Sequence, residues 1–221
     1  MSFSPPGDGR ANPATEKDNN TMKKRLKIQT MGLLIGLLLA GVAQAKPAED
    51  AYDPVPGVRQ PAMRRVVVRW DSNVLARIEF TRSKLPPQYR ERFNFAWAVA
   101  KIDGLDKTEY FAHSGIQSLD DFSSQEAQKL AGISVRPEKG RFYTLCVNQN
   151  DIVDGPNCWQ RTVDTEYKIL EDLVSRLPDT SVKGRLKLYT DLPPCASCWN
   201  VFKQFMAEYT NVAVQVLYKV K

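Results

Sequence analysis

Two cysteines stand three positions apart near the end of the chain, in the stretch LYTDLPPCASCWNVF, residues 188–202. An apolar run ends there, two prolines follow, and an apolar pattern at helical spacing begins after Cys195 and Cys198. A C-x-x-C pair at a helix start is typical of redox chemistry or metal binding, because the helix dipole favours the thiolate form. The pattern alone leaves open whether the two cysteines hold each other, a metal ion or nothing.

The other two cysteines call for a different interpretation. Cys146 and Cys158 lie twelve positions apart and flank the turn-rich stretch VNQNDIVDGPN. An even number of cysteines in an exported protein is typical of disulfide bonding. We therefore expect a loop-closing disulfide between Cys146 and Cys158.

Export itself is predicted from the N-terminal region. The stretch that begins at Met22 has a positive segment, an apolar segment over 31–42 and an Ala-Gln-Ala site at 43–45. This order is typical of a secretory signal peptide, and an uncleaved N-terminal anchor is the alternative. We expect cleavage after Ala45, a secreted or periplasmic mature chain, and no stable membrane insertion after cleavage. Residues 1–21 either extend the signal or precede the true start.

Composition favours one globular domain rather than two. The chain has 221 residues, of which 43% are hydrophobic and 25% are charged. Residues 1–45 carry six of the 31 Lys and Arg and three of the 25 Asp and Glu, so the net charge of +6 falls to +3 without them. That charge is too small to indicate a nucleic-acid partner by itself. The predicted organisation is a leader over 1–45, a proline-rich arm over 46–63 and a domain over 64–221.

Hydrophobic periodicity predicts an α/β fold with a mixed sheet. We expect strands over 64–70, 96–102, 108–116, 141–149, 184–192 and 211–220. We expect helices over 88–95, 118–132 (capped by Ser118), 162–177 and 195–209, and leave 74–80 as a strand or a helix start. The segment 96–116 forms a hairpin, and the final helix is long enough to connect parallel strands. Helices packed on this sheet give a three-layer arrangement.

Two predicted helices begin with residues that can bind a metal or transfer protons. Their combined motif resembles that of a known enzyme superfamily. The zinc-dependent, cytidine deaminase-like enzymes carry H-x-E followed by P-C-x-x-C. Here Asp164 stands in place of the histidine, Glu166 matches the glutamate, and Pro194 precedes the cysteine pair. The stretches AVAKIDG, EYFAHSGI and VDTEYKILEDL are similar to the bacterial toxin branch of that superfamily. The resemblance covers roughly residues 94–220.

The resemblance implies a site and an activity. Zn²⁺ would be held by Asp164, Cys195 and Cys198, with one position open for water. Glu166 would transfer protons while the amino group of a base leaves as ammonia. The substrate would be a nucleic acid or a nucleotide, and the protein would be a toxin or effector with an immunity protein as partner. As a ligand, Asp164 would add a negative charge to the zinc site that the histidine of the usual motif does not add.

Further residues are candidates for substrate contact. In the resembling fold the strand end at His113 and Ser114 borders the pocket, so we expect both to touch substrate. A loop histidine without a role and a replacement zinc ligand are the alternatives for His113. Aromatic residues that could stack on a base, or belong to the core, are Phe111, Trp159 and Trp199. Arginines that could contact phosphate, or form a solvated face, are Arg136, Arg141 and Arg161.

Two other functions compete with a deaminase. A secreted C-x-x-C pair also suggests a thiol-disulfide oxidoreductase that uses Cys195 and Cys198. Thioredoxin-like folds place this motif early, whereas 23 residues follow Cys198 in this sequence. The second alternative is a non-catalytic binding module on the same scaffold, and the presence of Glu166 favours an enzyme over it.

Overall fold

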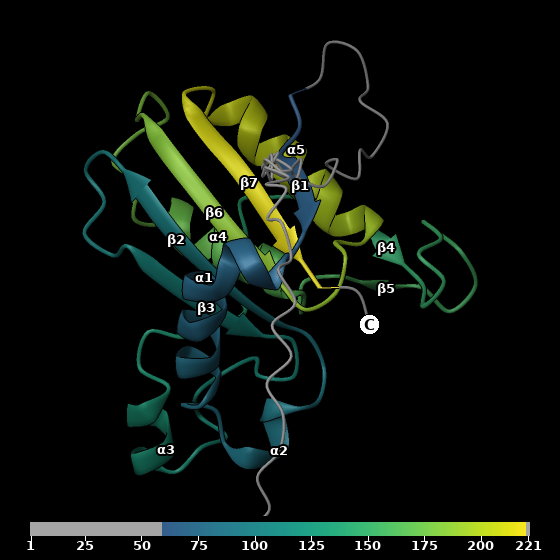
Figure 1. Cartoon of the computed structure of the whole chain (residues 1–221). Helices are drawn as coiled ribbons and strands as arrows, with labels where there is room; N and C mark the ends of the chain where they lie inside the picture. The colour runs from purple at the N-terminus through teal and green to yellow at the C-terminus, as the bar shows by residue number, and fades with distance from the viewer. Residues whose placement is uncertain (1–58, 220–221) are drawn as a thin grey trace, which may run out of the picture. The chain divides into compact units, whose positions relative to one another are not determined.

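Five strands form one mixed sheet in the order β1-β7-β6-β2-β3 (Figure 1). A computed structural model describes residues 59–219, and the predicted signal peptide lies outside this part of the chain. The strands are β1 (Ala62–Arg65), β2 (Phe95–Ile102), β3 (Glu109–His113), β6 (Gly184–Thr190) and β7 (Val212–Tyr218). β1 and β6 both run parallel to β7, whereas β2 is antiparallel to β6 and to β3. The predicted hairpin and the predicted parallel pair are confirmed.

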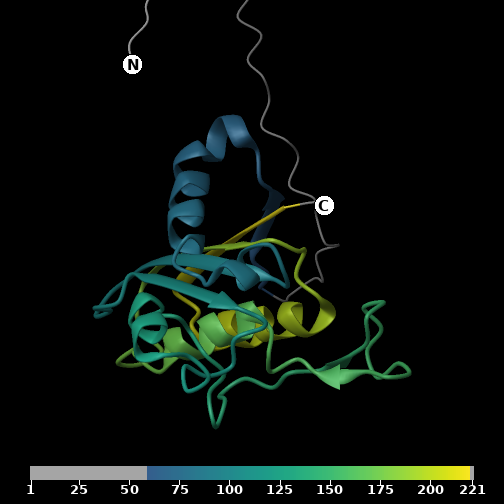
Figure 2. The same ribbon diagram turned by 90° about the horizontal axis from the view of Figure 1, so that it is seen from below.

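Helices cover both faces of this sheet, as Figure 2 shows. α1 (Val68–Arg82) lies on one face, and α4 (Thr165–Val174) and α5 (Ala196–Glu208) lie on the other. The connections hold four shorter elements: α2 (Pro87–Arg90), α3 (Ser124–Lys129), β4 (Cys146–Val147) and β5 (Trp159–Gln160). This three-layer arrangement confirms the expected α/β fold class. Within residues 59–219, no helix combines the length and the apolar composition that crossing a membrane requires.

Strand β2 shows how the sheet accommodates both layers. Successive side chains of a strand point to opposite faces. Phe95 and Trp97 belong to the apolar cluster on the α1 side, whereas Ala96, Ala98 and Ala100 belong to the cluster on the α4 and α5 side. Because alanine side chains are small, α4 packs directly against this face of β2.

Helix α4 is buried on almost every side. Leu170 is fully buried in the core cluster against the sheet. On another side of the helix, the Glu171 carboxylate accepts a hydrogen bond of 2.8 Å from the backbone N–H of Phe142. The helix predicted over 162–177 is therefore confirmed, with its ends drawn in by a few residues.

The predicted strand over 64–70 is wrong in its second half, where α1 begins, and the ambiguous segment 74–80 lies inside that helix. The Asp71 carboxylate accepts a hydrogen bond of 2.8 Å from the backbone N–H of Val67. It also pairs with the Arg64 guanidinium at 2.6 Å. These contacts fix the first turn of the helix and override the β preference of three consecutive valines.

The predicted helix over 118–132 forms only at 124–129. Its cap is Ser123 rather than Ser118. Ser123 and Glu126 form a capping box, in which each side chain accepts a hydrogen bond from the backbone N–H of the other. The sequence holds two serines before the helical pattern, and only the capping glutamate three positions later distinguishes them.

Two more predicted elements are shorter than expected. The helix over 88–95 ends after one turn at Arg90, and Phe93 takes a left-handed conformation with φ of 63° before β2 begins. The strand over 141–149 is reduced to the two residues of β4. The irregular backbone after α2 lines the cavity described below.

A buried lysine joins α4 to the end of β3. The Lys168 ammonium donates hydrogen bonds to the backbone carbonyls of His113, at 3.0 Å, and Ile116, at 2.6 Å. The side chain is fully buried, and burial lowers the pKa of Lys168 to about 7. The unfolded chain keeps this proton up to about pH 10.4. Between these pH values the unfolded chain binds more protons, so the free energy of unfolding rises with pH there.

We predict that Lys168→Gln reduces the rise of the free energy of unfolding with pH above about pH 7. Losing one titrating group removes a slope of at most about 1.4 kcal/mol per pH unit from the free energy of unfolding. Urea denaturation at a series of pH values between 7 and 10.5 measures the slope. Lys129→Gln, which makes the same charge change at an exposed position of α3, is the control. Parallel slopes for wild type and Lys168→Gln would contradict the prediction.

Candidate active site

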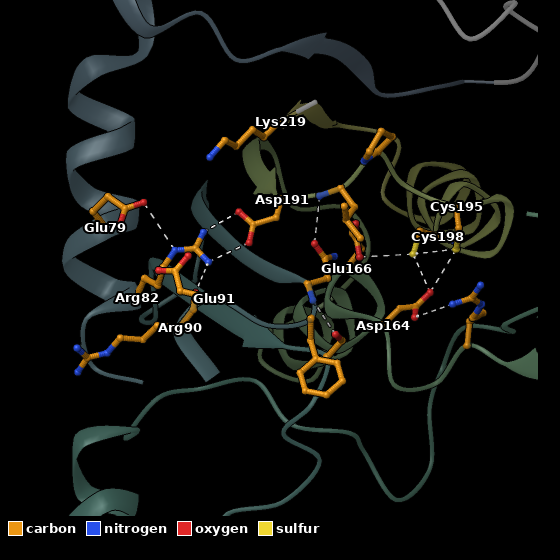
Figure 3. Close-up of a pocket in the computed structure, with 16 residues that line it drawn as sticks. Glu79, Arg82, Arg90, Glu91, Asp164, Glu166, Asp191, Cys195, Cys198 and Lys219 are labelled. Carbon is orange, nitrogen blue, oxygen red and sulfur yellow. Dashed lines mark hydrogen bonds and ion pairs between the residues drawn. The ribbon is translucent and has the colours of Figure 1, made fainter. Parts of the chain in front are cut away.

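The N-terminal ends of α4 and α5 bring three acidic side chains together. Asp164 is the N-cap of α4, and Cys195, which follows two prolines in the turn after β6, is the N-cap of α5. The Asp164 Oδ2 atom lies 3.2 Å from the Cys195 Sγ and 3.3 Å from the Cys198 Sγ. The two sulfurs are 3.5 Å apart (Figure 3). We call Asp164, Cys195 and Cys198 the donor cluster.

The donor cluster has the composition and the spacing of a metal site. Two thiolates and a carboxylate suit a borderline-soft ion such as zinc. Tetrahedral coordination with the usual zinc bond lengths places such atoms about 3.5–3.8 Å apart. The spacings of 3.2–3.5 Å are within a few tenths of an ångström of that range. Three protein donors also leave the fourth tetrahedral position free, as in catalytic zinc sites.

Negative charge is crowded in this cluster. Burial raises the pKa of Asp164, even though Arg161 and the two thiols act against the rise. The pKa of the Cys198 thiol is raised well above its usual value, first by its hydrogen bond with Cys195, then by burial and by the nearby carboxylates. Without a cation, burial and mutual repulsion therefore disfavour the ionised forms of Asp164 and Cys198. A divalent cation would reverse that balance, because it stabilises every deprotonated donor at once.

Glu166 lies beside the donor cluster. It follows the N-cap of α4 by two positions, and its Oε2 lies 3.5 Å from the Cys198 Sγ. The Thr165 hydroxyl donates a hydrogen bond of 2.8 Å to the same oxygen, which orients the carboxylate. Burial and then the Asp164 carboxylate raise the pKa of Glu166. A buried carboxyl group with a raised pKa is suited to taking up and returning a proton.

Asn94 joins the segments that surround Glu166. Its side-chain amide donates to the hydroxyls of Thr165, at 2.7 Å, and Thr190, at 2.9 Å. Its carbonyl oxygen accepts a hydrogen bond of 3.1 Å from the backbone N–H of Leu192. One residue thus connects the start of α4 with the end of β6. Sequence reasoning missed Asn94, because an asparagine before a strand carries no signal of such long-range contacts.

A cavity of about 700 Å³ opens above the donor cluster and Glu166. Arg82 of α1 and Asp191, which follows β6, form a bidentate ion pair in its wall, with distances of 2.9 and 2.6 Å. Lys219 projects toward the cavity from the end of β7 (Figure 3). Phe93, which is 68% exposed, also lines it. The cavity therefore combines a floor of acidic donors with walls that carry charges of both signs and the ring of Phe93.

The structure brings Ser114 to the cavity but not His113. Ser114 lines the cavity and its hydroxyl accepts a hydrogen bond from the backbone N–H of Asn94 at 3.0 Å. His113 is fully buried, where its Nε2 donates to the Arg92 carbonyl and its Nδ1 accepts from the Gly115 N–H. Both ring nitrogens are thus occupied by backbone groups. This geometry leaves His113 no free atom for a substrate or a metal.

The three aromatic residues proposed for base stacking lie elsewhere. Phe111 and Trp199 are buried in the two core clusters, on opposite faces of the sheet. Trp159 is 43% exposed on β5, with the Arg161 guanidinium 3.9 Å from its ring centre. None of the three lines the cavity, whereas Phe93 does. Phe93 was missed because its segment has a helical pattern in the sequence.

Of the three arginines proposed for phosphate contact, only Arg161 lines the cavity. Its guanidinium lies 3.8 Å from Asp164 Oδ1, so it faces the donor cluster. Arg141 pairs with the Glu208 carboxylate on the outer side of α5. Arg136 lines a second cavity beside Tyr167, away from the donor cluster.

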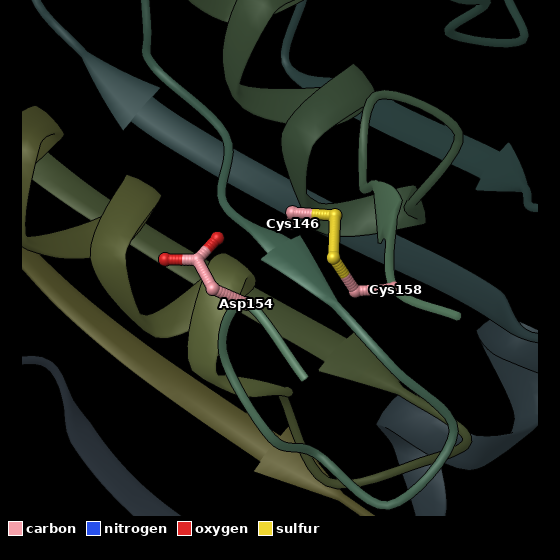
Figure 4. Close-up of side chains that lie close together, drawn as sticks. All are labelled: Cys146, Asp154 and Cys158. Carbon is pink, nitrogen blue, oxygen red and sulfur yellow. A yellow bond between two sulfur atoms is a disulfide. The ribbon is translucent and has the colours of Figure 1, made fainter. Parts of the chain in front are cut away.

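Cys146 and Cys158 are joined by a disulfide, shown in Figure 4. Asp154 lies near both sulfurs, so these three residues also meet the spacing of a metal site. The disulfide removes both thiolates, however, and a single exposed carboxylate is left. The pair therefore closes a loop and offers no metal site in this state.

Comparison with known proteins identifies one family. A family model described as Toxin-deaminase, the BURPS668_1122 family of deaminases, matches residues 79–220. The match covers more than half of the chain and includes the donor cluster, Glu166 and most of the cavity wall. No curated protein and no solved structure matches the chain.

We predict that the purified protein binds one zinc ion per chain through the donor cluster. Cys198→Ser and Asp164→Asn should weaken zinc binding by more than the roughly 10–100-fold loss typical of outer-shell changes, since each replaces an anionic donor with a neutral, weaker one. Competition with a chelating dye measures the affinity. Glu166→Gln is the matched control, because it alters a neighbouring carboxylate that is not in the donor cluster. A loss of affinity in Glu166→Gln equal to that in Asp164→Asn would show that Glu166 is itself a ligand.

Proposed function

This chain belongs to the Toxin-deaminase family, and from that premise we propose that it is a zinc-dependent enzyme that removes the amino group of a base in a nucleic acid or a nucleotide. The observation that carries the proposal is the position of Glu166. Its carboxylate lies beside the donor cluster on the cavity floor, 3.5 Å from the Cys198 Sγ. A catalytic deaminase site requires this combination of three donors, an open position and an adjacent acid.

The residues divide the chemistry between them. A zinc ion held by Asp164, Cys195 and Cys198 would supply Lewis-acid activation of a water molecule. Glu166, whose carboxylate lies on the cavity floor, would accept the two protons of the attacking water in turn. It would pass one to the ring nitrogen and the other to the amino group that leaves as ammonia. The raised pKa of Glu166 supports both directions of transfer.

The excess negative charge of the donor cluster is offset by its surroundings. Two thiolates, a carboxylate and a zinc ion sum to a charge of −1. The Arg161 guanidinium, 3.8 Å from Asp164, compensates part of this charge. The positive ends of the α4 and α5 dipoles point at the same place, because the cluster sits at both N-termini. These groups therefore offset the extra negative charge that an aspartate ligand carries and a neutral histidine ligand does not.

The cavity wall supports a nucleobase as the substrate group. Phe93 is an exposed aromatic ring that lines the cavity and meets the buried His113 ring edge to face at 5.9 Å. Bases stack favourably on such rings, at about 1–3 kcal/mol per base. We therefore assign Phe93 as the stacking platform. Ser114 is the polar residue at the same wall that remains a candidate substrate contact.

Delivery as a toxin is consistent with the N-terminal signal. We propose that the mature chain leaves the producing cell, as the signal-peptide pattern over 22–45 indicates. A disulfide between Cys146 and Cys158 suits an oxidising compartment. A producing cell that makes a nucleic-acid-modifying toxin also needs an inhibitor, so we include an immunity protein as a partner.

The two competing functions are less well supported. A thiol-disulfide oxidoreductase needs Cys195 and Cys198 as a redox pair, yet both sulfurs also contact Asp164, which an exchange reaction does not require. A binding module would not need a buried, oriented Glu166. Membership of a deaminase family favours the hydrolytic function over both.

We predict that Glu166→Gln abolishes deamination while zinc remains bound. Removing a general acid-base costs typically 10²–10⁴-fold in rate. Ammonia release from single-stranded oligonucleotides and from free nucleosides, each containing cytosine or adenine, measures the activity and identifies the substrate. Metal analysis of the same sample is the control. Full activity in Glu166→Gln would eliminate the proposed mechanism.

We predict that Phe93→Ala raises the KM for the substrate identified in this way, by about 5–150-fold, since it removes one stacking contact. Phe93→Tyr keeps an aromatic ring and should retain most of the affinity. Phe80→Ala, which truncates another exposed phenylalanine on α1, is the control and should leave KM unchanged. Equal KM values for Phe93→Ala and wild type would exclude Phe93 as the platform.

A further inference from the structure

The loop closed by the disulfide, residues 146–158, has a defined shape. Asp151, Asp154 and Asn157 take left-handed backbone conformations, with φ of 61°, 52° and 56°. Aspartate and asparagine tolerate this conformation better than other residues with a side chain. The Asn148 side chain accepts a hydrogen bond from the backbone N–H of Ile152 at 3.0 Å and holds the turn from inside. We call residues 146–158 the disulfide loop.

The disulfide loop contacts the start of α5. The Asp151 carboxylate accepts a hydrogen bond of 2.8 Å from the backbone N–H of Ala196. Ala196 is the first residue of α5 and directly follows Cys195 of the donor cluster. Just before the loop, the backbone N–H of Leu145 donates to the Ser197 hydroxyl at 3.0 Å. The Cys195 Sγ accepts from the backbone N–H of Cys198 in the first turn, and Asp151 takes up the N–H of Ala196, which has no partner within the helix.

The same loop is tied to the start of α4 through Arg161. The Arg161 guanidinium donates to the backbone carbonyls of Val147, at 3.1 Å, and Asn148, at 2.9 Å. Its remaining nitrogen faces Asp164 at 3.8 Å. One side of the loop therefore fixes the helix that carries the two cysteines, and the other side fixes the residue that faces the aspartate.

We propose that the disulfide loop is a clamp that positions the donor cluster, with Asp151 and Arg161 as its positioning residues. This inference rests on the proposed metal site and adds to it the part of the chain that holds the donors in register. The donors come from two separate helix starts, and groups around a metal site that orient its ligands typically change affinity 10–100-fold. The disulfide keeps both contacts in place by closing the loop.

The test compares two aspartates of the same loop. Asp151→Ala and Asp154→Ala both replace an aspartate in a left-handed conformation, so they share the same backbone cost, but only Asp151 bonds to α5. We expect zinc affinity, measured by chelator competition on the full chain, to fall about 10–100-fold in Asp151→Ala. Asp154→Ala should keep the wild-type affinity. Asp151→Asn, which retains an acceptor oxygen, should recover most of the loss.

Two further measurements separate a clamp from general stabilisation. The rate of Cys195 and Cys198 alkylation in zinc-free protein should rise in Asp151→Ala but not in Asp154→Ala, because the first turn of α5 loosens. The double variant Cys146→Ser/Cys158→Ser should weaken zinc binding in the same way as Asp151→Ala. Equal zinc affinities and alkylation rates in the two alanine variants would overturn the clamp alone. Absence of zinc binding in the wild type would overturn the proposed metal site together with the clamp.

Discussion

The central constraint of this molecule is the proximity of acidic groups at two helix starts. Asp164, Cys195 and Cys198 lie within 3.5 Å of one another, with Glu166 at the same distance from Cys198. Ionised acidic groups this close together in a partly buried site repel one another unless a cation compensates them. The donor cluster is therefore suited to a divalent ion, and hydrogen bonds from the surrounding structure keep the donors together.

The scaffold meets this constraint through topology and close packing. The parallel pair β6 and β7 requires a crossover helix, and that crossover places the start of α5 at the end of β6. The alanine face of β2 lets α4 pack close to the same sheet, so its start lies beside that of α5. Asn94 and the disulfide loop then connect the ends of these elements by hydrogen bonds. Backbone geometry thus brings the donors within reach, and side-chain contacts set their final spacing.

The function follows from what stands around the cluster rather than from the cluster alone. A zinc site with two cysteines is also typical of structural zinc sites, in which all four positions are protein ligands. Here three donors line an open cavity of about 700 Å³, with Glu166 beside them and the aromatic ring of Phe93 in the same lining. Membership of a deaminase family favours a catalytic site over a structural zinc site. A base bound in this cavity would meet Glu166 at the floor and the Phe93 ring at the wall.

The sequence by itself predicted the α/β class, the helices that carry Asp164 and Cys195, and the pairing of Cys146 with Cys158, because each depends on local periodicity or on spacing along the chain. It did not predict where Phe93, Asn94 and Asp151 lie or what they contact. Those residues lie in irregular segments, and their contacts join positions up to about a hundred residues apart, such as the 98 between Asn94 and Leu192. His113 is the opposite case: the resemblance predicted that it contacts substrate, but the folded chain buries it away from the cavity. Neighbouring residues determine the helices and strands, so the sequence predicts them. Packing between distant residues determines which side chains reach the cavity, so only the tertiary structure shows them.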